Sequence, residues 1–177
     1  MRIEADAVLR HPREAVFTAY RDDLPAFVEF LPNVRAIEVL ERREEGGVVH
    51  LHNRMHGATE LPAPLAQRLE ERFLSWDDRA RWDRSEWSCR WRISTHAFES
   101  AVRCTGRSDF IDLGGDRTRL EIGGELSIEL GEVKAVPAFL AGSLGRTAER
   151  FLVRQISANL AAVADALAAY LREDTVA

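Results

Sequence analysis

The chain of 177 residues is 46% hydrophobic and 30% charged, which is typical of one soluble globular domain spanning residues 1–177. Its formal net charge is −5, and acids and arginines are interleaved without a basic block, which argues against a nucleic-acid partner. We expect no stable membrane insertion, because no apolar run reaches the about 18 residues of a spanning helix. The opening MRIEADAVLR lacks the apolar block of an export signal, so we expect a cytoplasmic protein.

The first part of the chain predicts a strand followed by two short helices. Residues 2–10 alternate apolar and charged side chains, as a strand with one buried face does. Pro12 favours a helix start, and apolar residues then recur at helical spacing up to Tyr20. Pro25 and Pro32 bound a second short helix.

Alternating apolar residues then predict a run of antiparallel strands joined by short turns. A short helix is expected between the second and third of them, within LPAPLAQRLEERF. Gly106, Gly123 and Gly124 fall inside strands, where glycine marks a bulge, a bend or a close approach. The expected strands span 34–45, 47–57, 74–83, 87–95, 98–112 and 117–130.

The last forty residues change to a period of three or four. From Leu140 to Leu171 the apolar positions predict one long amphipathic helix. A sheet with a single apolar face must cover that face, and this helix is the one element long enough. We therefore predict an α+β fold in which a curved antiparallel sheet wraps round the C-terminal helix. A cavity remains wherever the sheet curves more than the helix fills.

All four tryptophans lie in one stretch, LSWDDRARWDRSEWSCRWRI. By alternation Trp76 and Trp82 share one face of a strand, and Trp87 and Trp91 share one face of the next. All four are therefore expected on the concave side, opposite the helix. They either fill the core or line a pocket and stack on a ligand. A surface that grips a partner is a third interpretation, but exposed indoles would break the alternation.

Few polar residues are expected on the concave face. Asp78 would have a raised pKa there and could act as an acid or base, unless a bulge turns it to water. Asn53 could hold a ligand carbonyl or satisfy a backbone group. The further candidates for the cavity wall are Met55, Phe110, Phe139, Leu140, Leu144 and Phe151, with Thr95, Ser108 and Asn159 as additional polar groups.

The histidines and cysteines do not predict a metal site. His50 and His52 share a strand face roughly 7 Å apart, which would allow two ligands to one ion, but His56 lies too far along the strand. That face is the polar one, so we interpret them as solvated and expect neither metal nor cofactor. Cys89 and Cys104 fit no metal spacing and are expected to be buried free thiols.

This order of elements resembles the START-like, or SRPBCC, superfamily with its helix-grip fold. The resemblance covers nearly the whole chain. HPREAVFTAYRDDLPAFVEFLPNVRAIEVLER resembles the helical pair leading into the second strand, and AERFLVRQISANLAAVADALAAYL resembles the helix that the sheet grips. The segments that resemble its middle strands are WDDRARWD, CRWRISTH and CTGRSDF.

The resemblance implies a pocket for a hydrophobic or aromatic small molecule between sheet and helix. It fixes no reaction, because the superfamily shares no catalytic signature. The first hypothesis is therefore binding or carrying a lipid, a quinone or a polyketide-like aromatic. The second is a polyketide aromatase/cyclase, and the third is a protein-interaction module with a vestigial cavity. The sparse polarity of the inner face favours the carrier, because a cyclase needs inward acid–base groups.

Overall fold

The computed structural model describes residues 1–31, 33–58, 74–96, 102–128 and 143–174. Within these residues seven antiparallel strands form one sheet in the order β1-β7-β6-β5-β4-β3-β2. The strands are β1 (Arg2–Leu9), β2 (Val34–Glu45), β3 (Val48–Gly57), β4 (Ser75–Asp83), β5 (Ser88–Thr95), β6 (Val102–Asp112) and β7 (Thr118–Ile128). The helices are α1 (Arg13–Asp22), the 3-10 helix η1 (Leu24–Phe30) and α3 (Ser143–Asp174).

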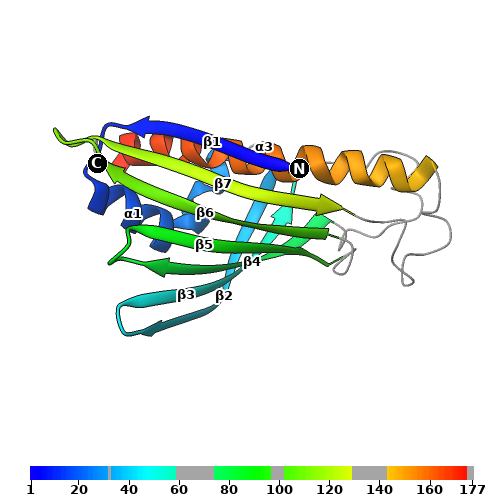
Figure 1. Cartoon of the computed structure of the whole chain (residues 1–177), viewed down its shortest axis with the longest axis horizontal. Coiled ribbons are helices and arrows are strands. Elements are labelled where there is room, and N and C mark those ends of the chain that lie inside the picture. The colour runs from blue at the N-terminus through cyan, green and yellow to red at the C-terminus, as the bar shows by residue number, and fades with distance from the viewer. Residues whose placement is uncertain (32, 59–73, 97–101, 129–142, 175–177) are drawn as a thin grey trace.

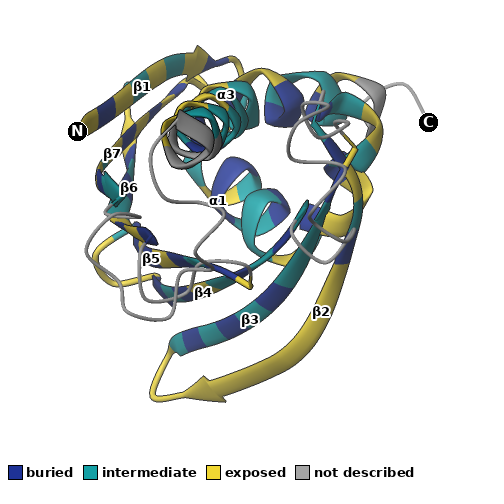
Figure 2. Cartoon of the chain, turned by 90° about the vertical axis from the view of Figure 1, so that its right-hand side faces the viewer, coloured by how far each residue is buried: buried dark blue, intermediate teal, exposed yellow. Residues whose placement is uncertain are grey.

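The sheet curves round α3, as the sequence predicts. Figure 1 shows α3 running behind the strands, and Figure 2 shows α1 and α3 enclosed by the curve of the sheet. The long helix contacts β1, β7, α1 and η1. This is a helix-grip arrangement, in which the concave apolar face of the sheet is covered by a single long helix.

Alternation along the strands sets which side chains reach the concave face. In β7 the buried residues Leu120, Ile122 and Leu126 alternate with exposed Glu121 and Glu125. Each buried side chain adds to one apolar surface, which would cost free energy if it were left in water. The strand prediction for this part of the chain is confirmed within the described residues.

The short helices close one end of this concave surface. α1 begins after Pro12 and buries Val16 and Phe17. The Phe17 ring makes edge-on contacts with Trp82 and Phe110, with ring centroids 5.3 and 5.1 Å apart. Such edge-to-face pairs add about 0.5–1.5 kcal/mol to the free energy of burial. The aromatic cluster therefore fixes α1 against β4 and β6.

The helix α3 buries one face against the sheet and the short helices. Its buried residues include Leu152, Ile156, Leu160 and Leu167, which repeat at helical spacing. The segment Arg150–Arg172 is long and apolar enough by composition to cross a membrane. Of its apolar stretch, 39% is buried, and the helix contacts strands and helices of the same domain.

Some of the predicted elements lie outside the described residues, and others differ from the prediction in type or in bounds. The helix expected within LPAPLAQRLEERF lies outside the described residues, as do Phe139 and Leu140. The second short helix is a 3-10 helix, and β5 begins at Ser88. The residue before it, Trp87, therefore belongs to the turn between β4 and β5.

Candidate functional site: a cavity between the sheet and the long helix

A cavity lies between the concave face of the sheet, the short helices and α3. The space open to the centres of water molecules is about 100 Å³. One water needs roughly 10–15 Å³ on this measure, so a compact ligand with on the order of ten non-hydrogen atoms would fill it. Its described walls are mainly apolar, and include Leu24, Met55, Ile93, Phe151, Ile156 and Leu160.

The structure places some of the predicted site residues at this cavity and others away from it. Trp76, Trp82, Trp91, Met55, Asp78 and Phe151 line it, together with Thr95 and Asn159. Of the other predicted residues, Asn53, Phe110, Ser108 and Trp87 are not among the lining residues. Leu144 belongs to α3, but its side chain is outside what the structure describes.

Trp87 is the one of the four indoles that is not among the described residues lining the cavity. Its backbone φ is +50°, a left-handed conformation, so the alternation of inward and outward side chains along β5 does not extend to Trp87. Its ring lies 5.3 Å from that of Phe17, and the guanidinium of Arg13 sits 4.2 Å from the indole centroid. Trp87 therefore packs on α1 beside the turn instead of on the cavity wall.

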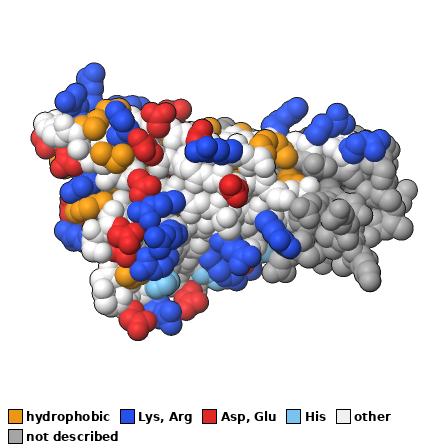
Figure 3. Space-filling model, in the orientation of Figure 1, with side chains coloured by type: hydrophobic (Ala, Val, Ile, Leu, Met, Phe, Trp, Pro, Cys, Tyr) orange, Lys and Arg blue, Asp and Glu red, His pale blue; other side chains and the backbone are white. Residues whose placement is uncertain are grey.

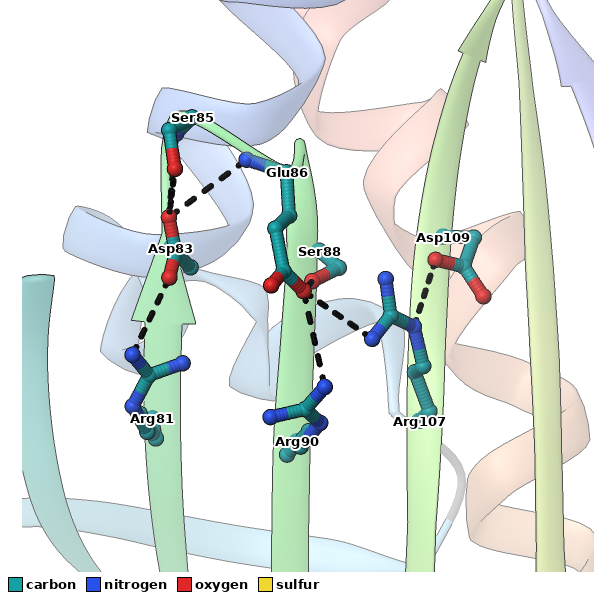
Figure 4. A network of polar contacts seen from close by, with 8 residues as sticks. All are labelled: Arg81, Asp83, Ser85, Glu86, Ser88, Arg90, Arg107 and Asp109. Atoms are coloured by element: carbon teal, nitrogen blue, oxygen red, sulfur yellow. Dashed lines mark hydrogen bonds and ion pairs between the residues drawn. The ribbon is translucent and has the colours of Figure 1, made fainter.

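A polar network holds the turn that carries Trp87 (Figure 4). Asp83 accepts hydrogen bonds from the Ser85 hydroxyl at 2.6 Å and the Ser85 backbone N–H at 3.0 Å. Glu86 pairs with Arg107 at 3.1 Å and with Arg90 at 3.5 Å. These contacts tie the turn to β5 and β6, and they fix the point at which the strand begins.

Trp91 lines the cavity but is mainly a packing residue. Its Nε1 donates a hydrogen bond to Ser108 Oγ at 3.2 Å. Its ring lies over Gly106 and Gly124, and a Cβ at Gly124 would stand only 2.6 Å from the ring. The two glycines are therefore the close approaches that glycine inside a strand can mark. Trp91 is 7% exposed, whereas Trp76, which also lines the cavity, is only partly buried.

Asp78 places a carboxyl group on this apolar wall. The strand register runs without a shift through Asp77 and Asp78, so the bulge considered for this dipeptide is absent from the described β4. Burial raises the pKa of Asp78 to about 6, although a hydrogen bond from Asn53 Nδ2 at 3.4 Å and nearby His52 act in the opposite direction. Asn53 thus contacts a side chain, not a backbone group, and is 1% exposed.

Several polar atoms at the cavity have no hydrogen-bond partner among the described residues. They are Thr95 Oγ1, Asn159 Oδ1 and Trp82 Nε1. Buried polar groups are rarely left unpaired, so these atoms are available to a ligand or to water. Tyr20 and Gln155 also line the cavity and were not among the predicted site residues. Burial, followed by nearby Cys89 and Asp78, raises the pKa of the Tyr20 phenol.

The convex face of the sheet is charged. Figure 3 shows arginine, acidic and histidine side chains over the strands on this side. Asp77 accepts hydrogen bonds from His52 and His96, each at 2.8 Å, and from Arg54 at 3.0 Å. Burial would raise the pKa of Asp77, but these hydrogen bonds outweigh it and hold the pKa well below its usual range. His50 lies in a groove with Arg43, Arg79 and Arg81.

The histidines do not gather into a metal centre in the described part of the chain. No group of three or more His, Cys, Asp or Glu residues there could hold a metal ion. His52 is engaged by Asp77, and His56 lies 3.2 Å from Glu38. Cys89 and Cys104 are buried free thiols, and burial raises the pKa of Cys104 to about 12.

Solved structures match the chain over nearly its whole length. The aromatase/cyclase ZhuI from Streptomyces sp. R1128 superposes with a TM-score of 0.67 at 17% identity, covering 99% of this chain and 95% of that chain. Norcoclaurine synthase from Thalictrum flavum superposes with a TM-score of 0.60 at 17% identity, covering 98% of this chain and 87% of that chain. Ara h 8.0201 superposes with a TM-score of 0.58 at 12% identity, covering 98% of each chain. No protein-family model and no curated protein sequence matches the chain.

These similarities agree on the fold. The chain shares the helix-grip arrangement of the matching proteins, with a curved sheet, short helices and a long C-terminal helix. The fold predicted from the order of elements is confirmed. At identities below a fifth, the likeness concerns the fold and leaves the ligand to be inferred from the cavity itself.

Proposed function

We propose that the protein binds and carries a compact hydrophobic small molecule in the cavity between the sheet and α3, as a soluble cytoplasmic protein. The observation that supports this proposal is the lining. Three indoles and many aliphatic side chains surround the space, with a few polar groups among them. Small-molecule sites are typically built in this way, with apolar walls for affinity and a few polar groups for orientation.

The size of the cavity favours one of the three ligand classes. A space of about 100 Å³ suits an aromatic ring system of one or two rings better than a long acyl chain or a quinone with its prenyl tail. Trp76 is the indole best placed to stack on such a ring, because it borders the cavity and is only partly buried. The proposed ligand is therefore a compact aromatic molecule.

A polyketide aromatase/cyclase is the second candidate, and Asp78 is the observation that favours it. A carboxyl with a pKa of about 6 can give and take a proton near neutral pH. It borders the same cavity as the Tyr20 phenol. A cyclase would lose turnover of a polyketide substrate when Asp78 is replaced by Asn, while a carrier has no turnover to lose.

The proposal is tested by calorimetric titration with 2-naphthol, a fused two-ring aromatic that suits the cavity. The chain should bind one equivalent saturably. Val163→Phe, which adds a ring at the cavity wall on α3, should abolish binding. Val153→Phe is the matched control, since Val153 is also a partly buried residue of α3 but is not a lining residue.

Two results would contradict this proposal. One is heat of binding that Val163→Phe leaves unchanged, which would place the ligand outside the cavity. The other is the absence of binding by 2-naphthol and by other one-ring and two-ring aromatics. That second result would favour an interaction module whose cavity no longer holds a ligand.

A further inference from the structure

An acid, the carboxyl of Asp78, lies on the wall of the cavity. Asp78 borders it, and none of the described residues that line it is an arginine, a lysine or a histidine. Among the described residues its carboxyl accepts one hydrogen bond, the long contact of 3.4 Å from Asn53 Nδ2. A carboxylate offers about four acceptor positions, so most of its capacity is left unused on the protein side.

Other oxygen acceptors border the same space. Thr95 is 4% exposed, and its Oγ1 has no hydrogen-bond partner in the described residues. In the β4–β5 register Asp78 lies opposite Ile93, so Thr95 is its diagonal neighbour on the same face. Diagonal neighbours stand roughly 7–8 Å apart, a gap that one small group can bridge. Asn159 Oδ1, from α3, is also unpartnered and lines the cavity.

From this arrangement we infer that the cavity selects ligands that carry a protonated amine on a compact apolar body, with Asp78 as the counter-ion. The inference rests on the proposed function and specifies its ligand class. An ammonium group supplies three N–H donors and a positive charge, whereas the cavity supplies a carboxylate and further unpaired oxygens. The aromatic body would lie against the indoles, where cation and ring also attract each other.

The charge balance around Asp78 supports an incoming cation. The titratable groups near it are Tyr20 from α1, Cys89 from β5 and Cys104 from β6, whose pKa values Asp78 helps to raise. His52, from the opposite face of β3, acts to lower the pKa of Asp78. From α3 the cavity receives the neutral amides of Gln155 and Asn159. An ammonium ion would therefore lower the pKa of Asp78 by pairing with the ionised form.

The test uses a matched pair of probes, 2-phenylethylamine and 2-phenylethanol, which differ in one polar group. At pH 7.5 the amine should bind the chain at least about tenfold more tightly than the alcohol, the effect of one opposite charge at a buried carboxyl. Below about pH 6 the affinity for the amine should fall about tenfold per pH unit, while that for the alcohol should stay nearly constant.

Two variants test whether the preference for the amine comes from the carboxyl of Asp78. Asp78→Asn should remove the preference for the amine and keep binding of the alcohol, which shows that the cavity is intact. Asp77→Asn is the matched control, since it removes the adjacent carboxylate on the other face of β4 and should keep the preference. Melting temperatures of both variants report whether they are folded.

The outcomes separate this inference from the proposal on which it rests. If both probes bind equally, if the alcohol binds more tightly, or if Asp78→Asn keeps the preference, the amine inference is wrong and the cavity still binds compact ligands. If neither probe nor 2-naphthol binds, the proposed function fails, and the inference fails with it.

Discussion

Asp77 and Asp78 are consecutive residues of β4 with the same side chain, but they lie on opposite faces of the sheet. On the convex face, two histidines and Arg54 donate hydrogen bonds to Asp77, and its pKa is held well below the usual range. On the concave face, the carboxyl of Asp78 accepts one long hydrogen bond from the described residues, and burial raises its pKa to about 6. The difference shows that the two faces have separate roles, one joining strands through charge and one enclosing a cavity.

The largest expected contrast between the faces comes from two strand glycines. A Cβ at Gly106 would overlap the Trp91 ring and the Gly123 carbonyl oxygen on the concave side, so Gly106→Ala should lower the free energy of unfolding by about 3 kcal/mol. A Cβ at Gly123 meets nothing within 4 Å, so Gly123→Ala should change it by less than about 0.5 kcal/mol. Urea denaturation measures both. Equal effects would show that the indole is not packed as described.

A contrast that depends on pH is expected at Asp78. Because the folded-state pKa is raised above its usual 3.8, its contribution to stability is present below pH 3.8 and is lost as pH rises through about 6. Asp78→Asn should therefore stabilise the fold by up to about 3 kcal/mol at pH 8 and by little at pH 3.5. Denaturation at the two pH values measures the difference, and a variant that is less stable at pH 8 would contradict the account.

The smallest effect is expected at Asp77, with the opposite sign. Its folded-state pKa is lowered, so its contribution is present above the usual value of 3.8 and is lost as pH falls below it. Asp77→Asn should lower the free energy of unfolding by about 1–2 kcal/mol at pH 7, because the hydrogen bonds to its carboxylate weaken when the charge is removed. The deficit should shrink below pH 4. If the variant is as stable as the parent chain at pH 7, the hydrogen bonds to Asp77 do not stabilise the fold as predicted.

The strands and the inward position of Asp78 could be predicted from the sequence, because alternation is a local signal. Residues two apart share a face, so Trp76, Asp78 and Trp82 follow from the period alone once β4 is placed. The long helix was predictable for the same reason, since its apolar spacing repeats over many turns. The cavity itself followed from the resemblance and from the need to cover one curved face.

The remaining features depend on contacts between distant segments. Trp87 leaves the alternation because its φ is positive, a conformation that is uncommon for a bulky residue and has no sequence signal here. Tyr20 joins the cavity because of where α1 packs, which helical spacing does not specify. The cluster at Asp77 needs His96, which reaches it only through the β4–β5 register.

The most direct test of the account is a carbon-13 NMR titration of the aspartate side-chain carboxyls, recorded without and with 2-naphthol. We predict that Asp78 titrates near pH 6, that Asp77 stays ionised far below the usual range, and that only the Asp78 signal moves when the ligand is added. If both carboxyls titrate near the usual value, the two faces of the sheet do not differ as described. If the ligand shifts the Asp77 signal and leaves the Asp78 signal unchanged, the concave cavity is not the binding site.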